Sequence, residues 1–156
     1  MTHPDYQKEK TYEFTALGEL DSLKLQKLQT GIWLNGSSIQ TLPCRITVSG
    51  TSVLSEILPT LHPEVQTAIG RNRQSHPVVM GTITITEGRK RQIRRMMKAV
   101  RCCVVALKRI SIDNIVLDTI LKPGQWKPIL PPGRTCIAGR SEATPKIDQE
   151  QEKPCR

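Results

Sequence analysis

The chain has 156 residues, of which 37% are hydrophobic and 24% are charged, a size and composition typical of one domain with a short tail. It contains no apolar run approaching the roughly 18–20 residues that cross a bilayer, and its first residues lack the apolar segment of a secretory signal. We therefore exclude membrane and secreted proteins and expect a cytoplasmic protein with reduced thiols. The five cysteines include no C-x-x-C pair, so the sequence predicts no metal site of the structural zinc type.

Alternating residues, helix caps and turn signals predict the elements of the first half. In chain order these are a strand at residues 10–18, a helix that begins at Asp21 or Ser22 and ends before Gly31, a turn at Asn35-Gly36 and a strand at residues 45–48. Residues 49–77 carry Pro and Gly interruptions that resist assignment, although Pro63 can start a helix that runs to about Ile69.

The second half predicts three further strands and one amphipathic helix. The strands cover residues 78–86, 103–112 and 115–117, and a tight Asp113-Asn114 turn joins the last two. Between the first two strands, apolar residues recur at the spacing of one narrow stripe of a helix: Ile93, Met96, Met97 and Val100. The intervening basic residues fall on the opposite arc, so we expect this helix to present a cationic face to solvent.

Strands mixed with a few helices, without regular alternation of the two, predict an α+β fold with a mixed, largely antiparallel sheet and flanking helices. From Pro131 onward the composition changes to Pro, Gly, Ser, Thr and mixed charge, with few large apolar residues. Such a segment cannot bury enough surface to offset its ordering entropy. We therefore expect a domain at residues 1–130 and a disordered tail at residues 131–156.

The net charge of +9 comes from one window of the chain. Residues 88–109 contain nine basic residues and no acid, and the 14 basic residues elsewhere equal the 14 acids. The nine are Arg89, Lys90, Arg91, Arg94, Arg95, Lys98, Arg101, Lys108 and Arg109. A solvated helix face is the ordinary explanation of a charge run, but like charges without interspersed acids repel one another, and a bound polyanion relieves that repulsion. Charge alone leaves both RNA and DNA open as the polyanion.

Two motifs in and beside this window resemble a known signature. The chain reads Glu87-Gly88-Arg89-Lys90-Arg91-Gln92-Ile93-Arg94-Arg95-Met96-Met97 and later Leu107-Lys108-Arg109-Ile110. These runs resemble the signature of the RsuA-like pseudouridine synthases, which modify ribosomal RNA. Further segments agree in order and spacing: His3-Pro4 with Tyr6, Lys10-Thr11-Tyr12, Leu42-Pro43, and Leu121 with Gly124, Trp126 and Lys127. The resemblance spans residues 1 to about 130 and is strongest to the large-subunit branch, which acts on 23S ribosomal RNA.

The resemblance implies an isomerase that converts uridine to pseudouridine without a metal or an organic cofactor. It also implies a gap, because the family carries its catalytic aspartate in a G-R-L-D segment just upstream of the part matched by His3-Pro4, and no G-R-L-D occurs here. We therefore interpret the sequence as the C-terminal portion of such a catalytic domain, truncated at its N-terminus. The alternatives are a non-catalytic RNA-binding remnant of that fold and an unrelated small basic protein, either ribosomal or DNA-binding. The expected partner is ribosomal RNA, and we expect a monomer or a chain completed by an N-terminal fragment.

The resemblance assigns roles to individual residues. Tyr12 matches the family tyrosine that stacks on the target base and can take part in proton transfer, and Arg94 matches the arginine that pairs with the aspartate. Leu107 matches the apolar residue that lines the uracil pocket. The predicted contacts to the RNA backbone are Lys10, Arg89, Lys90, Arg91, Arg95, Lys98, Arg101, Lys108 and Arg109. The competing structural roles are a half-buried strand tyrosine, a surface arginine and a core leucine.

Overall fold

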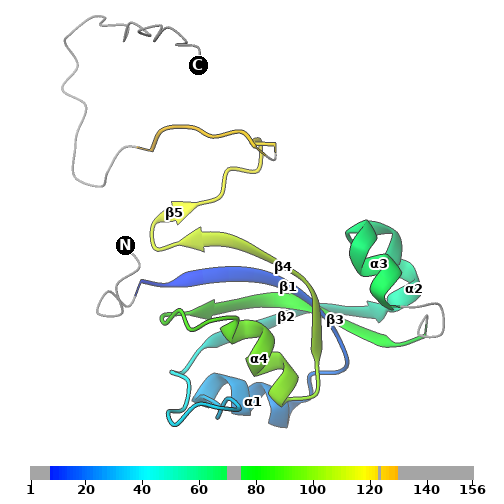
Figure 1. Ribbon diagram of the computed structural model, residues 1–156, viewed down its shortest axis with the longest axis vertical. Helices are drawn as coiled ribbons and strands as arrows, with labels where there is room; N and C mark the ends of the chain where they lie inside the picture. Colours follow the sequence, from blue (N-terminus) through cyan, green and yellow to red (C-terminus); the bar gives the residue numbers. More distant parts are fainter. Residues whose placement is uncertain (1–7, 70–74, 123, 130–156) are drawn as a thin grey trace, which may run out of the picture. The chain divides into compact units, whose positions relative to one another are not determined.

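The computed structural model describes residues 8–69, 75–122 and 124–129 (Figure 1). Five strands form one sheet in the spatial order β2-β3-β1-β4-β5, and every pairing among them is antiparallel. The strands are β1 (Lys10–Leu17), β2 (Arg45–Val53), β3 (Pro77–Ile85), β4 (Cys103–Ile112) and β5 (Ile115–Val116). The expected α+β class is confirmed.

The helices are α1 (Ser22–Thr30), α2 (Leu54–Ile57), α3 (Pro63–Ile69) and α4 (Gln92–Ala99), with a short 3-10 helix η1 (Leu58–Thr60) between α2 and α3. The caps of α1 follow the sequence prediction. The Asp21 side chain accepts a hydrogen bond from the Lys24 backbone N–H at 2.8 Å. At the other end Gly31 takes a φ of 101°, a conformation that side chains disfavour, and ends the helix.

The main hydrophobic core lies between one face of the sheet and helices α1 and α4 (Figure 1). Leu28 of α1 and Met96 and Met97 of α4 are fully buried in it. They pack with strand residues that include Phe14, Ala16, Ile46, Val79, Ile83 and Ile85. A Cβ at Gly81 would lie 3.0 Å from Cζ of Phe14, so glycine lets this ring pack directly across β3. The apolar stripe of α4 packs on these strand residues and holds the helix against the sheet.

A second hydrophobic cluster accounts for residues 49–77. Strand β2 continues five residues past the predicted 45–48, to Val53, and α2, η1 and α3 follow. Leu54 and Leu61 from this segment are buried against Leu17 and Val78 of the sheet. Figure 1 shows these short helices to one side of the sheet, away from α1 and α4. The segment therefore completes the sheet and a second core.

The domain prediction stays a prediction. The chain divides into two compact units, residues 1–119 and 120–156, and the predicted tail at 131–156 lies outside the described residues. The residues His3, Pro4 and Tyr6 of the resemblance lie outside them too. No helix in the described part of the chain is long and apolar enough to span a bilayer.

Candidate functional site

The basic run occupies the turn after β3 and the exposed face of α4. Arg91 precedes the helix with a φ of 52°, the left-handed conformation that residues other than glycine seldom adopt. The next residue, Gln92, begins α4, whose Ile93, Met96 and Met97 are buried in the core. Exposed basic side chains fill the opposite arc, at Arg91, Arg94 and Lys98, with the half-buried Arg95 beside them. We call these four residues the cationic face of α4.

Strands β1 and β4 place Tyr12 and Leu107 on the same side of the sheet as α4. Leu107 pairs with Phe14, so both side chains lie on one face, and Phe14 belongs to the core under α4. Tyr12 stands two residues before Phe14 and therefore shares this face. Both Tyr12 and Leu107 are half-buried and pack against the core. Arg109, the strand partner of Tyr12, is exposed.

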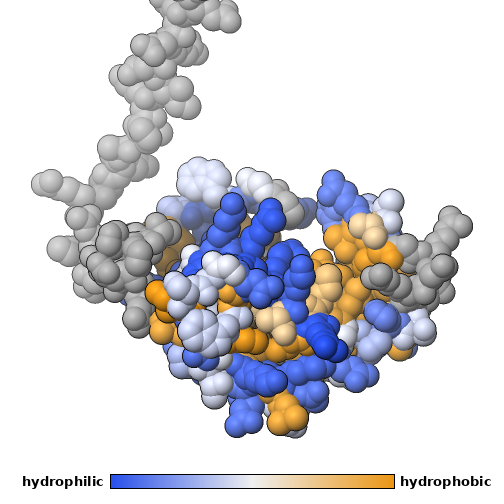
Figure 2. Space-filling model, turned by 60° about the horizontal axis from the view of Figure 1, so that its bottom comes forward, coloured by the Kyte–Doolittle hydropathy of each residue, from blue (hydrophilic) through white to orange (hydrophobic). Residues whose placement is uncertain are grey.

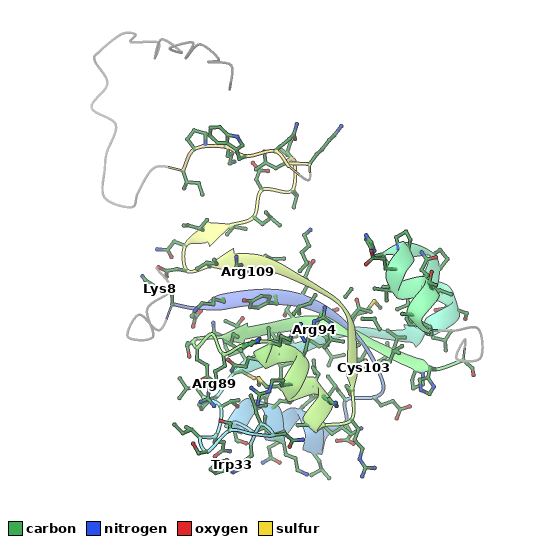
Figure 3. The ribbon with its side chains drawn as sticks, viewed as in Figure 1. Lys8, Trp33, Arg89, Arg94, Cys103 and Arg109 are labelled. Atoms are coloured by element: carbon green, nitrogen blue, oxygen red, sulfur yellow. The ribbon has the colours of Figure 1, made fainter. Side chains whose placement is uncertain are left out.

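Arg94 joins α4 to strand β4. Its guanidinium donates from Nη1 to the carbonyl oxygen of Val104 at 2.6 Å, so the side chain reaches from the helix to the strand that carries Leu107 (Figure 3). None of the carboxylates in the described residues forms an ion pair with Arg94. The structure thus brings Arg94, Tyr12 and Leu107 to one side of the sheet, with the arginine held by a backbone contact.

The other predicted RNA-contacting residues do not form one uniform group. Lys90, Arg101 and Arg109 are exposed, as are Arg91 and Lys98 of the cationic face. Lys10 Nζ donates to the carbonyl oxygens of Lys8 at 2.8 Å and of Thr86 at 3.2 Å, which places it at the start of the basic run. Lys108 pairs with Glu13 on the face of the sheet opposite to Leu107. Contact between RNA and each of these residues stays a prediction.

Arg89 is bound to other parts of the protein, although it belongs to the same basic run. Its Nε donates to Glu87 Oε2 at 2.9 Å, and its Nη2 donates to the carbonyl oxygen of Gln40 at 2.7 Å. Its Nη1 donates to the carbonyl oxygen of Ile39 at 2.8 Å and to Ser37 Oγ at 3.2 Å. These bonds fix the α1–β2 loop, residues 31–44, against the start of α4.

Glu87 and Gln92 complete this network, and sequence reasoning assigned neither a role. Gln92, only 3% exposed, donates from Nε2 to Glu87 Oε1 at 2.6 Å, and its Oε1 accepts from the Arg89 backbone N–H at 3.0 Å. Glu87 Oε1 also accepts from the Leu42 backbone N–H at 2.9 Å. The available signal was an amide within the cationic run and a carboxylate immediately before it. We call Glu87, Arg89 and Gln92 the latch of the α1–β2 loop.

The surface around α4 combines polar and apolar side chains. Figure 2 shows hydrophilic side chains gathered across the middle of the face that it presents, with hydrophobic patches on either side. Among the described residues, no three His, Cys, Asp or Glu side chains come together as a metal site would require. The chemistry that this arrangement offers is binding of a polyanion beside a half-buried tyrosine and an arginine that can hold a carboxylate.

Comparison with known proteins identifies the fold and the family. No family model matches the chain. The ribosomal large subunit pseudouridine synthase E of Vibrio parahaemolyticus is 33% identical over 129 residues, which are 83% of this chain and 49% of that protein. The enzyme of the same name from Xanthomonas campestris is 34% identical over 127 residues, 81% of this chain and 62% of that protein. The chain belongs to the RsuA-like family of pseudouridine synthases.

Other members extend the similarity to the small-subunit branch and to a solved structure. The ribosomal small subunit pseudouridine synthase A of Escherichia coli is 30% identical over 129 residues, 83% of this chain and 44% of that protein. A crystal structure of a pseudouridylate synthase superposes with a TM-score of 0.61 and 26% identity, covering 83% of this chain and 44% of that one. This RsuA-like chain therefore spans about half the length of the relatives it matches.

Proposed function

We propose that the chain is the RNA-binding and uridine-contacting part of a ribosomal RNA pseudouridine synthase. Its substrate is a uridine of ribosomal RNA, in the large-subunit (23S) RNA by its similarity to synthases E, and it works in the cytoplasm. The observation that carries the proposal is the position of Arg94, which lies on the side of the sheet that holds Tyr12 and Leu107 and has no carboxylate partner in the described residues. A carboxylate entering beside Arg94 would complete the site.

The family reaction breaks the N-glycosidic bond of uridine, rotates the uracil and rejoins it to the ribose through C5. The positive charge of Arg94 would keep a neighbouring aspartate ionised next to the RNA phosphates. The Val104 contact fixes the guanidinium, so the aspartate would be received in a prepared position. Tyr12 would place its ring on the uracil and its hydroxyl near the base, and Leu107 would exclude water from one side.

The cationic face of α4 would hold the RNA backbone through its phosphates. The arginine fork binds phosphate oxygens in a bidentate manner, and Arg91 at the N-cap of α4 and Lys98 in its last turn are both exposed, while Arg94 is kept for the aspartate. The target base must leave its stack to reach Tyr12, at a cost of a few kcal/mol that these contacts would offset. The aspartate would come from a G-R-L-D segment of the kind that the family resemblance implies, which this sequence does not contain.

Release of tritium from ribosomal RNA labelled at C5 of uridine tests the proposal, because the reaction replaces the hydrogen at that carbon. The full chain is assayed with and without a separate polypeptide that carries the G-R-L-D segment implied by the family resemblance. We expect RNA binding by the chain in both cases and tritium release only with the fragment. Arg94→Ala should lower the release by roughly a hundredfold or more, and Arg94→Lys, which keeps the charge but loses the fork, should recover part of it.

Two other outcomes would contradict the proposal in different ways. RNA binding without release, with the fragment present, would make the chain the non-catalytic RNA binder of the alternative hypothesis. Absence of RNA binding at low salt would remove both hypotheses.

A further inference from the structure

The α1–β2 loop carries large apolar side chains that the protein does not bury. Trp33 is 60% exposed, Ile39 is 67% exposed and Leu42 is 38% exposed. Single exposed apolar residues are normal on protein surfaces, but these three share one loop of 14 residues, from Gly31 to Cys44. An exposed indole and two aliphatic chains on one loop mark it as a contact surface.

The backbone that presents these side chains is held in place. Ile32 and Thr41 bind each other across the loop, through the Thr41 N–H to the Ile32 carbonyl at 3.0 Å and the Ile32 N–H to Thr41 Oγ1 at 2.9 Å. Gln40 Nε2 donates to the Gly31 carbonyl at 2.7 Å. In addition, the latch (Glu87, Arg89 and Gln92) binds the loop to the start of α4. The protein has therefore ordered this loop while leaving its Trp33 side chain in solvent, which is the arrangement of a prepared binding surface.

The loop contacts α4 at Arg95, on another side of the helix from the contact of Arg94 with β4. Arg95 donates from Nη2 to the Asn35 carbonyl, so this edge of the helix touches the loop two residues after Trp33. The other edge touches β4 through Arg94. Figure 3 shows Arg94 on the sheet side of α4, and Arg89 and Trp33 on its other side. A polyanion lying across the helix from the predicted uridine site would therefore reach the loop.

We propose that Trp33 stacks on an unpaired base of the bound RNA, a nucleotide other than the target uridine. The inference rests on the proposed function, because the cationic face must first hold the RNA. Stacking of a base on a flat aromatic ring does not require a particular sequence, and proteins recognise RNA mostly at such unpaired bases. Arg95, which contacts the loop at Asn35, supplies positive charge next to it, and phosphates flank every base of a single strand. Trp33 thus favours RNA that carries an unpaired base in addition to the target uridine.

The fluorescence of Trp33 tests the inference directly. The chain contains two tryptophans, so Trp126→Phe leaves Trp33 as the sole indole emitter. The probes are an RNA hairpin with an unpaired loop and a fully paired RNA duplex with the same number of phosphates. We expect the hairpin to quench the emission along the same curve that anisotropy of the labelled RNA gives for binding. The duplex should bind through its phosphates without quenching.

Affinity of variants provides the second readout. Trp33→Ala should weaken hairpin binding by about 5- to 100-fold, with an unchanged salt dependence and unchanged duplex binding, while Trp33→Phe should recover part of the loss. Leu23→Ala, at a 70% exposed apolar residue of α1, is the matched control and should change neither. If anisotropy shows that the hairpin binds but the emission of Trp33 does not change, this inference alone is overturned. Binding of a protein rather than RNA to the α1–β2 loop would also overturn it. Absence of binding to either RNA would overturn the proposed function and this inference with it.

Discussion

Arg89 and Arg91 stand two residues apart in one basic run, yet they occupy different environments. The Arg89 side chain is 26% exposed and is bound to a carboxylate, two carbonyls and a hydroxyl. Arg91 is exposed and adopts a left-handed backbone conformation at the start of α4. The run therefore contains two regions. The latch holds the α1–β2 loop against α4, and the cationic face is exposed to solvent and available to bind a partner. Its charge indicates binding of a polyanion, but the backbone decides which residues are available for it.

The latch exists because a half-buried carboxylate must be compensated. The Glu87 side chain is 14% exposed, and a carboxylate withdrawn from water costs several kcal/mol unless it is paired and hydrogen-bonded. Arg89 supplies the charge, while Gln92 and the Leu42 N–H supply hydrogen bonds. No carboxylate among the described residues pairs with the outward cations, which repel one another along the helix. Removal of residues from the two regions should therefore have opposite consequences for stability and binding.

The largest expected effect is the loss of stability in Arg89→Ala. This change leaves the Glu87 carboxylate and the carbonyls of Ile39 and Gln40 without their partner, and we expect it to lower the free energy of unfolding by about 2–4 kcal/mol. Arg91→Ala removes the same side chain from an exposed position and should change it by less than about 0.5 kcal/mol. Urea denaturation followed by circular dichroism measures both. Equal losses in the two variants would break the distinction between the regions.

A smaller loss is expected at the other end of the latch. Gln92→Leu keeps the volume of a buried side chain but removes its bonds to Glu87 and to the Arg89 backbone, and should cost about 1–3 kcal/mol. Because Gln92 and Arg89 share Glu87, the double variant with Arg89→Ala should lose less than the sum of the single losses, by about 0.5–3 kcal/mol. The double variant of Gln92→Leu with Lys98→Ala should be additive. An additive result for the first pair would show that the latch does not act as a unit.

Local patterns predicted much of this molecule, and long-range contacts explain what they missed. The apolar stripe of α4, the Asp21 cap of α1 and the start of α3 at Pro63 depend on neighbouring residues and were confirmed. The inward turn of Arg89 depends on acceptors 49 to 52 residues earlier in the chain, which no local pattern indicates. The extension of β2 to Val53 was missed because Ser, Gly and Thr interrupt its alternation, while pairing with β3 sustains the strand.

The candidate site shows the same division between local and distant information. Motif resemblance singled out Tyr12, Arg94 and Leu107, and the structure places all three on one side of the sheet. Their roles stay predictions, since those roles depend on bound RNA and a carboxylate. Trp33 was not singled out, because a tryptophan in a loop has no pattern of its own. Its significance comes from the loop hydrogen bonds and from the contact between Arg95 and Asn35.

Cys44, at the buried end of the α1–β2 loop, makes the stability of this part of the protein depend on pH. Burial raises the pKa of the Cys44 thiol to about 11, from an ordinary value of 9.0, and its Sγ donates to the Leu28 carbonyl at 3.1 Å. Between these two pH values the unfolded chain loses this proton and the folded chain keeps it. The associated stability is therefore complete below about pH 9 and is lost as the pH rises to about 11, by up to about 2 kcal/mol.

Cys44→Ala isolates this contribution from the lysines and tyrosines that titrate in the same range. At pH 7 the variant should have a lower free energy of unfolding than the unmodified chain, because of the small cavity. Between pH 9 and pH 11 its free energy of unfolding should fall less than that of the unmodified chain. Chemical denaturation at pH steps across this range gives both curves. Parallel curves would mean that the Cys44 thiol reaches solvent and that the loop is not closed over it.

The smallest expected effect on stability belongs to the cationic face, where the effect on RNA binding is specific. Arg91→Ala combined with Lys98→Ala should leave the free energy of unfolding within about 0.5 kcal/mol, because both side chains are exposed. If each residue neutralises one phosphate of a single strand, the slope of log affinity against log salt should become shallower by about 1.4. Lys108 is a predicted RNA contact by motif resemblance but pairs with Glu13 on the opposite face of the sheet, so if only the face of α4 binds RNA, Lys108→Ala should leave the slope unchanged. A slope that falls equally per charge in all variants would mean that the whole basic surface attracts RNA, and that the division between the two faces has no part in binding.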